Sequence, residues 1–309
     1  MDIETLDTLV FAGGGVRGFS YVGVLMAFRD TYKKSPGKHF STFAGTSVGS
    51  LFALLCCLDL DLSDAMKIFK DVGLENIFQK DPTCLLSSYA LNSGSALESL
   101  VHSLLALGSL DSSTTLKQLY DRTKKKLVVA VIDLYTANML YLDHLNIGCD
   151  MPVAKAIMGS MALPPLFPPV AYSKGRSRLL MTDGGLLETS PVALFDTSKA
   201  LLVSSIWYID NSTINDIAGY YSRIVHIMLL GTYDVQEKAT RSYLSIDVDL
   251  GSISPDCTDI DVNQIIFLGY RAAIGRLTSK EYTRELYDPT KFIRDSATEA
   301  LRPAFFSKL

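Results

Sequence analysis

Residues 9–18 read LVFAGGGVRG, so that four apolar residues lead into three glycines, and a helical pattern then continues to about Tyr32. The same order repeats once. Residues 39–44 form a candidate strand, GTSVG at residues 45–49 forms a turn, and residues 48–58 form an apolar candidate helix. Strand, glycine turn and helix in succession are typical of a layered α/β fold. We therefore expect helices packed against a central sheet.

The rest of the chain continues both kinds of element. Apolar periodicity predicts strands at residues 127–134, 139–142, 179–182 and 200–209, the second of them antiparallel, and helices at 61–72, 97–105, 151–161, 217–239 and 262–277. Ser63 is the expected cap of the first of these helices. Since no repeat or linker-like shift in composition divides the chain, we predict one domain over residues 1–286, followed by a tail at residues 287–309.

Composition excludes several classes of protein. The chain of 309 residues is 48% hydrophobic, enough for a sizeable core, and its net charge is −4. Nucleic-acid binding is not expected, because it needs a basic surface. The first residues lack the pattern of a signal peptide, and the apolar run at residues 51–58 is far shorter than the roughly 20 residues of a membrane span. Scattered cysteines without metal spacing indicate a reducing compartment, either cytoplasmic or nuclear, and a cytoplasmic protein is expected.

The glycine turn at residues 13–18 has the spacing G-x-G-x-x-G of a dinucleotide site. Such a site also needs an acidic residue about 20 positions on to hold the ribose, and residues 39–44 offer none. The nucleotide interpretation is therefore disfavoured. Successive glycine amides beside a helix N-terminus still form a concave donor site for an anion, either a phosphate or the oxyanion of a transition state.

The second turn, at residues 45–49, has the form G-x-S-x-G between a strand and a helix. A nucleophile on such a sharp turn needs neighbours without a Cβ two residues to either side, and Gly45 and Gly49 occupy those positions. Ser47 is therefore a candidate nucleophile. The alternative is an ordinary helix entry with Ser47 as the N-cap.

A catalytic serine needs a base. None of the four histidines, His39, His102, His144 and His226, lies in a glycine-marked loop at a strand end. Asp183 does, because it follows residues 179–182 and precedes Gly184 and Gly185. A carboxylate that reaches the serine hydroxyl can act as the general base. The alternative for Asp183 is an ordinary Asp-Gly turn.

A fourth stretch, SMALPPLFPP at residues 160–169, precedes Asp183. In this order the four motifs resemble the patatin-like phospholipase family, over residues 9 to about 191. The resemblance implies a three-layer α/β/α sandwich with a mostly parallel sheet, and lipid acyl-ester hydrolysis without a metal or other cofactor. It makes Ser47 the nucleophile and Asp183 its partner in a Ser-Asp dyad. It also places the oxyanion hole at the amides of Gly13, Gly14 and Gly15.

The expected function is hydrolysis of the fatty-acyl esters of membrane phospholipids through an acyl-enzyme. The alternatives are a neutral-lipid or soluble-ester hydrolase and a non-catalytic lipid-binding module. The expected partner is the lipid substrate, met by peripheral contact with a membrane or lipid droplet. Because an apolar chain must leave the bilayer, exposed apolar segments are expected near the site. Candidates are residues 85–110 and the tail residues Phe292, Ile293, Phe305 and Phe306, with core packing as the alternative for both.

Two further features bear on the substrate. Arg17 lies beside the glycines, and a guanidinium suits the geometry of a lipid phosphate. The alternative is that Arg17 orders the glycine loop through a carboxylate or a carbonyl. After Gly185 the chain reads LLETSP at residues 186–191, where members of the family often carry asparagines. This departure predicts an altered pocket wall and leaves the dyad intact.

Overall fold

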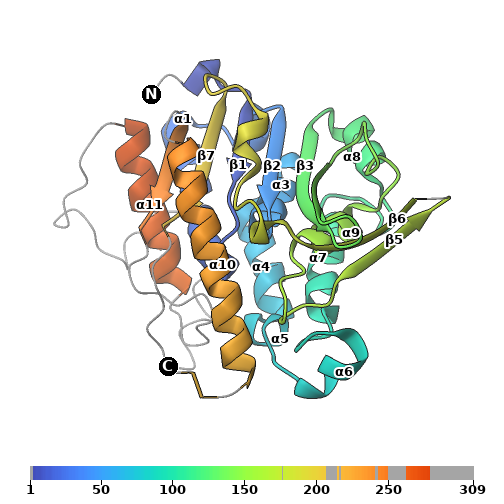
Figure 1. The fold of residues 1–309 in the computed structure, drawn as a ribbon. Coiled ribbons are helices and arrows are strands. Elements are labelled where there is room, and N and C mark those ends of the chain that lie inside the picture. The colour runs from blue at the N-terminus through green and yellow to red at the C-terminus, as the bar shows by residue number, and fades with distance from the viewer. Residues whose placement is uncertain are drawn as a thin grey trace.

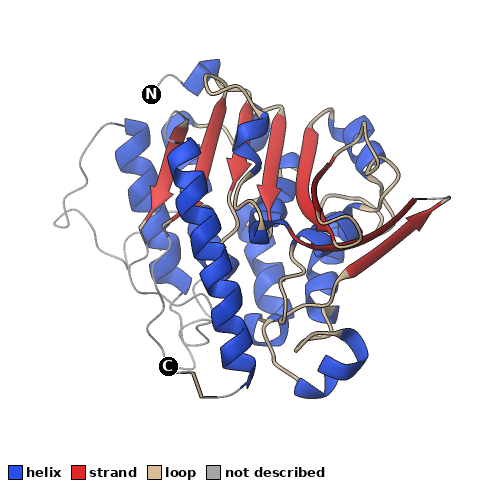
Figure 2. Cartoon of the chain, viewed as in Figure 1, coloured by secondary structure: helices blue, strands red, loops and turns tan. Residues whose placement is uncertain are grey.

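The computed structural model describes residues 3–175, 177–206, 214–215, 217–240, 243–249 and 262–278. Its strands form one twisted sheet (Figures 1 and 2) in the order β5-β6-β3-β2-β1-β7-β8, and β4 pairs with β3 off this path. The strands are β1 (Thr8–Phe11), β2 (Thr42–Thr46), β3 (Lys126–Asp133), β4 (Asn138–Leu142), β5 (Val170–Lys174), β6 (Ser177–Asp183), β7 (Ala200–Ser205) and β8 (Leu244–Val248).

The centre of the sheet is parallel. β1 pairs in parallel with β2 and β7, β2 with β3, and β7 with β8, whereas β4 and β6 run antiparallel to β3 and β5 runs antiparallel to β6. The central strands are short apolar runs that are buried on both sides, as a parallel sheet covered by helices requires. The antiparallel strand expected at residues 139–142 is confirmed as β4.

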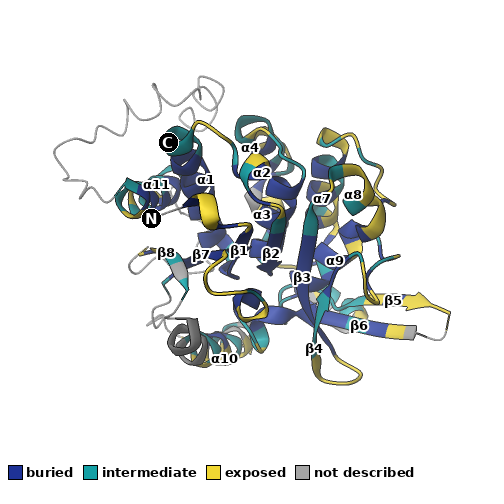
Figure 3. Ribbon diagram, turned by 90° about the horizontal axis from the view of Figure 1, so that it is seen from above, coloured by how far each residue is buried: buried dark blue, intermediate teal, exposed yellow. Residues whose placement is uncertain are grey.

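Helices cover both faces of the sheet, so the expected three-layer α/β/α architecture is confirmed (Figure 3). On one face lie α1 (Phe19–Tyr32), α3 (Val48–Cys57), α9 (Val153–Ser160) and α11 (Val262–Thr278), with α4 (Leu62–Val72) and α7 (Ser95–Leu107) packed beside them. On the other face lies α10 (Ile217–Thr240). The remaining short helices are α2 (Pro36–His39), α5 (Leu74–Ile77), α6 (Leu85–Ser88) and α8 (Leu116–Thr123).

Two local predictions are wrong. The strand expected at residue 39 begins at Thr42, because Pro36 starts the short helix α2 and His39 ends it. The cap of α4 is Asp61 rather than Ser63, since the Asp61 carboxylate accepts the backbone N–H groups of Ser63 and Asp64. A carboxylate in this position also complements the positive end of the helix dipole.

The sequence patterns also missed several elements. The strands β5 and β8 and the helix α8 were not predicted. The strand expected at residues 200–209 ends at Ser205, and residues 207–209 lie outside the described residues. The tail at residues 287–309, with its apolar side chains, also lies outside them. Among the described helices, none is both long enough and apolar enough to cross a membrane.

Candidate active site

Ser47 lies on a sharp turn between β2 and α3. Its backbone has φ 54° and ψ −132°, a region that a non-glycine residue occupies only under constraint. The flanking glycines supply the constraint. A Cβ on Gly45 would lie 2.3 Å from the backbone carbon of Gly49, and a Cβ on Gly49 would lie 2.3 Å from the Phe11 carbonyl oxygen. The spacing argument for these two glycines is therefore confirmed.

The alternative role of Ser47, as a side-chain cap of α3, is not what the structure contains. Ser47 occupies the N-cap position, but its side chain makes no capping hydrogen bond. Its side chain instead lies near the Asp183 carboxyl group, whose pKa it lowers. The turn therefore holds the hydroxyl away from its own helix.

Asp183 reaches the level of Ser47 through the register of three strands. Thr46 at the end of β2 pairs with Ala130 of β3, and Val131 of β3 pairs with Asp183 at the end of β6. Because β6 is antiparallel, its carboxyl end does not share the edge at which the parallel strands end. Asp183 is brought level with Ser47 because β6 stops part-way along β3. The sequence predicted only that Asp183 follows a strand, not that this strand is antiparallel to its neighbour.

The Asp183 carboxyl group is almost fully buried, with 1% of the residue exposed. Burial raises its pKa to about 7, while the hydrogen bonds from Ser47 and from the Gly185 backbone N–H lower it. The Gly185 N–H donates to Oδ1 at 2.8 Å, so the Asp-Gly turn exists alongside the contact with Ser47. Within the described residues no histidine contributes to this pKa. A carboxyl group with a pKa near neutrality can exchange a proton with a hydroxyl at physiological pH.

The glycine loop passes beside Ser47 and enters the 3-10 helix η2 (Gly15–Gly18). A Cβ on Gly13 would lie 3.4 Å from the Ser47 Cβ. The Gly13 N–H, however, donates to the Thr189 carbonyl oxygen at 2.8 Å. Gly13 is therefore wrong as an oxyanion donor in this conformation. The amides of Gly14 and Gly15 have no hydrogen-bond acceptor within the described part of the chain.

One segment braces both halves of the Ser47–Asp183 pair. The Ser160 hydroxyl accepts the Ser47 N–H at 2.9 Å and donates to the Ala130 carbonyl oxygen at 2.6 Å. Two residues later, the Ala162 carbonyl oxygen accepts the Asp183 N–H at 3.1 Å. Sequence reasoning singled out residues 160–169 as a motif but missed these contacts. The small side chains of the motif were the available signal, because only small residues allow so close an approach.

The motifs converge on one site, and a comparison with protein families agrees with them. The family model described as "Patatin-like phospholipase" matches residues 9–196, more than half of the chain. The chain belongs to the patatin-like phospholipase family. Lipid hydrolysis is thereby established at the level of the family, and all four sequence motifs fall within the matched residues.

Other proteins are similar to this patatin-like chain at lower identity. An uncharacterized protein of Bacillus subtilis, YqhO, is 25% identical over 205 residues, covering 62% of this chain and 67% of its own length. The uncharacterized protein R571 of Acanthamoeba polyphaga mimivirus is 23% identical over 194 residues, 62% of either chain. The chain therefore spans about two thirds of each relative.

Two solved structures share the fold. VipD from Legionella pneumophila superposes with a TM-score of 0.52 at 16% identity, covering 89% of this chain and 67% of that one. The type III effector ExoU superposes with a TM-score of 0.52 at 13% identity, covering 90% of this chain and 54% of that one. At these identities the likeness establishes the patatin-like fold alone.

Arg17, which follows the patatin-like glycines, is buried, with 2% of the residue exposed. An arginine at this depth does not reach a lipid headgroup without moving. Its burial therefore favours the alternative in which it orders the glycine loop. A neighbouring glycine is also needed for packing, because a Cβ on Gly18 would lie 2.7 Å from a Val48 methyl group.

The segment that departs from the usual patatin-like sequence is anchored to β4. Glu188 accepts a hydrogen bond from the Tyr141 hydroxyl. Burial raises the pKa of Glu188, and the Tyr141 bond partly offsets that rise. The next residue, Thr189, holds the Gly13 amide. Glu188 and Tyr141 are site residues that sequence reasoning missed, because no local pattern connects them.

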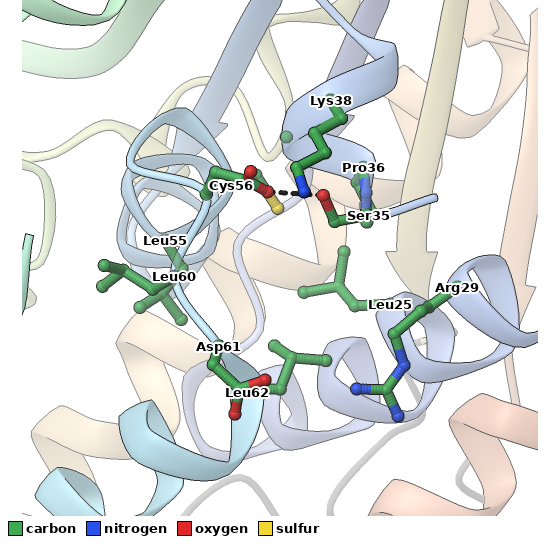
Figure 4. A pocket seen from close by; sticks show the side chains of 12 residues that line it. Leu25, Arg29, Ser35, Pro36, Lys38, Leu55, Cys56, Leu60, Asp61 and Leu62 are labelled. Atoms are coloured by element: carbon green, nitrogen blue, oxygen red, sulfur yellow. Dashed lines mark hydrogen bonds between the residues drawn. The ribbon is translucent and has the colours of Figure 1, made fainter. Parts of the chain in front are cut away.

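A cavity of about 190 Å³ lies at the far end of α3 from Ser47 (Figure 4). Its lining includes Leu25, Arg29, Ser35 and Cys56, and the Ser35 hydroxyl donates to Asp59 at 2.5 Å. Since Ser47 precedes α3 and Cys56 lies near its end, this cavity is separate from the candidate active site.

Proposed function

We propose that this chain is a serine lipid acyl hydrolase that cleaves the fatty-acyl esters of phospholipids through Ser47 and Asp183. The observation that carries the proposal is the buried Asp183, whose pKa is about 7 and which interacts with the Ser47 hydroxyl. Burial of a carboxyl group is costly, and perturbed groups of this kind cluster at catalytic sites. Family membership supports the lipid substrate class.

The proposed reaction begins when Asp183 accepts the Ser47 proton as Oγ attacks the acyl carbonyl. The developing oxyanion lies at the amides of Gly14 and Gly15, each of which is worth about 10²–10³ in rate if it acts like other oxyanion donors. Asp183 then returns the proton to the leaving alcohol, which leaves an acyl-Ser47 ester. A water molecule, deprotonated by Asp183, releases the fatty acid and restores the serine.

The site offers a reason why an aspartate suffices without a histidine. An ordinary aspartate is too weak a base to take a hydroxyl proton efficiently at pH 7, because its pKa is near 3.9. Burial raises the pKa of Asp183 to about 7, into the range in which a general base works best. We therefore expect kcat/KM to rise with pH through about 7, as Asp183 loses its proton.

The test is fatty-acid release from phosphatidylcholine, triacylglycerol and a soluble short-chain ester, measured by mass spectrometry. Ser47→Ala and Asp183→Asn should each lower the rate by at least about 10³-fold, as removal of a catalytic nucleophile or base does elsewhere. The matched controls, Ser95→Ala and Asp121→Asn, change exposed residues on other helices and should leave the rate unchanged.

Four results would contradict the proposal in whole or in part. If a folded Ser47→Ala protein has wild-type activity, Ser47 is not the nucleophile. If a fluorophosphonate fails to label Ser47 in the wild type, a non-catalytic lipid-binding module is favoured. Loss of activity in a His144→Ala/His226→Ala variant that stays folded would favour a histidine-dependent esterase. Preference for triacylglycerol over phosphatidylcholine would keep the chemistry but change the substrate class.

A further inference from the structure

The helix α10 exposes a stripe of large apolar side chains to solvent. Ile217 and Ile227 are 71% and 60% exposed. The spacing of the stripe, with steps of three and four residues, puts all its members on one side of the helix. We call this stripe the outer face of α10, and its members are Ile217, Tyr220, Tyr221, Ile224, Ile227 and Met228.

The opposite side of α10 already packs against the candidate active site. Leu229 is buried, and its methyl group would lie 3.4 Å from a Cβ on Gly185. The Thr232 hydroxyl donates to the Leu186 carbonyl oxygen at 3.4 Å. Within the described part of the chain, α10 is thus covered on the side of Leu229, whereas the outer face keeps large apolar side chains in solvent. A soluble helix normally turns its apolar stripe toward the core and its polar side outward.

The position of α10 relates the outer face to the site. The helix extends past the carboxyl ends of the parallel strands (Figure 1), which is the edge where Ser47 follows β2. It packs against the 3-10 helices η4 (Gly184–Leu186) and η5 (Pro191–Leu194), which follow Asp183 in the chain. Leu187 and Leu194 in this region are exposed as well. The apolar surface and the candidate active site thus share one side of the molecule.

The side chains of the outer face suit contact with a lipid bilayer. The turns that carry the outer face, residues 217–233, contain one charged side chain, Arg223, and the last turns of α10 add Asp234, Glu237 and Lys238. Isoleucine and methionine can enter the acyl region, and tyrosine prefers the interface between headgroups and acyl chains. Because the charges of the whole helix balance, the apolar side chains rather than electrostatic attraction would hold it on a bilayer.

We propose that the outer face of α10 binds a phospholipid bilayer. This contact would bring the carboxyl ends of the parallel strands, where Ser47 lies, close to the membrane. This inference rests on the proposed function, because a lipid substrate is what makes a bilayer the expected partner. Docking through α10 places the bilayer beside the helix that covers Gly185 and Leu186. An acyl chain then has a short apolar route from the membrane to Ser47.

The test separates binding from chemistry. Ile217→Gln/Ile224→Gln removes two outer-face side chains and keeps residues that favour a helix. Leu145→Gln is the matched control, because Leu145 is 76% exposed and follows β4 toward the opposite edge of the sheet. Each variant is made in the full chain, with and without Ser47→Ala, so that binding is measured without turnover. Co-sedimentation uses vesicles of phosphatidylcholine with and without phosphatidylserine.

The outer-face variant should bind vesicles at least about tenfold more weakly than the wild type, because two apolar side chains no longer enter the bilayer. Its fatty-acid release from vesicles should fall by the same factor, while its hydrolysis of a soluble short-chain ester stays unchanged. Leu145→Gln should match the wild type in all three measurements. Phosphatidylserine should change binding of the wild type little, because the charges of α10 balance.

The outcomes that overturn the docking proposal differ from those that overturn the proposed function. Vesicle binding by the outer-face variant equal to the wild type overturns the docking proposal. So does a wild-type dimer in analytical ultracentrifugation that the variant converts to a monomer, because a second copy of the chain would then cover the face. If instead the wild type shows no Ser47-dependent hydrolysis of the soluble ester, the proposed function fails, whatever the vesicles show.

Discussion

The two faces of the central sheet are covered in very different ways. On the face that α1, α3, α9 and α11 cover, a large continuous core includes rings of Phe11, Tyr21 and Phe52 with centroids 5.5–6.2 Å apart. On the other face, α10 and the segment after Asp183 lie over a small cluster that includes Val10, Ala44 and Leu202. The segment after Asp183, which is part of the candidate active site, therefore lies on the thinly covered face.

This difference indicates a division of work within one sheet. Stability follows buried apolar area, so the thickly covered face should supply most of the free energy of unfolding. Segments with few buried contacts open at low energetic cost, and elements that admit a substrate are drawn from them. We therefore expect substitutions on the first face to affect folding, and substitutions on the second face to affect the site.

The largest effect is expected where α1 meets α11. A Cβ on Gly269 would lie 1.9 Å from the Ser20 carbonyl oxygen, and a Cβ on Gly23 would lie 1.9 Å from the Ile266 carbonyl oxygen. Backbone cannot yield as a flexible side chain does, so Gly269→Ala should destabilise the protein by about 4 kcal/mol or more. Urea unfolding followed by circular dichroism measures this. A cost below about 1 kcal/mol would show that the two helices do not lie in such close contact.

The second effect concerns the buried carboxyl group. The pKa of Asp183 is about 7 in the folded protein and 3.8 as an ordinary value, so the folded state holds its proton more tightly. This contribution to stability is present below about pH 4 and is lost as pH rises to about 7. Asp183→Asn stays neutral at all these pH values. Above pH 7 its free energy of unfolding, measured in urea, should therefore exceed that of the wild type by up to about 4 kcal/mol. The difference in free energy should vanish below pH 4.

Asp121→Asn serves as the control for this experiment. Asp121 is exposed, and its hydrogen bond with Lys117 lowers its pKa rather than raising it. Removing that carboxylate should therefore give no gain in stability at any pH. An Asp183→Asn protein with the same pH dependence as the wild type would contradict the burial of an ionisable group at this site.

The third effect concerns the hydrogen bond that joins Glu188, in the segment after Asp183, to Tyr141 in β4. We call this hydrogen bond the tether. Tyr141→Phe removes the hydroxyl that donates to Glu188 and leaves a half-buried carboxylate without it. We expect a loss of about 1–3 kcal/mol in stability. We also expect a fall in kcat on the soluble ester, because Thr189, next to Glu188, fixes the Gly13 backbone. Tyr135→Phe, at an exposed tyrosine between β3 and β4, is the control. Equal kcat in the two variants would mean that the tether does not position the site.

The extent to which the site was predictable follows from the range of the interactions involved. Gly45, Ser47 and Gly49 were readable because their constraint is local, within one turn. The hydrogen bond from the Gly13 N–H to the Thr189 carbonyl oxygen was not predictable, because it joins residues far apart in the chain. The glycine motif alone indicated that this N–H group was available to an oxyanion. Periodicity predicted α10 almost to its ends, yet periodicity does not reveal which side of an apolar helix the protein covers.

The smallest effect uses the same substitution as the largest one, on the opposite face. Gly231 lies within α10, and a Cβ there would meet no atom within 4 Å. A glycine inside a helix costs conformational entropy, so Gly231→Ala should stabilise the protein by about 0.5–1 kcal/mol. Measured together in urea, Gly269→Ala and Gly231→Ala should shift the midpoint in opposite directions. If Gly231→Ala is destabilising, some part of the protein must cover α10 at this position, and the contrast between the two faces would weaken accordingly.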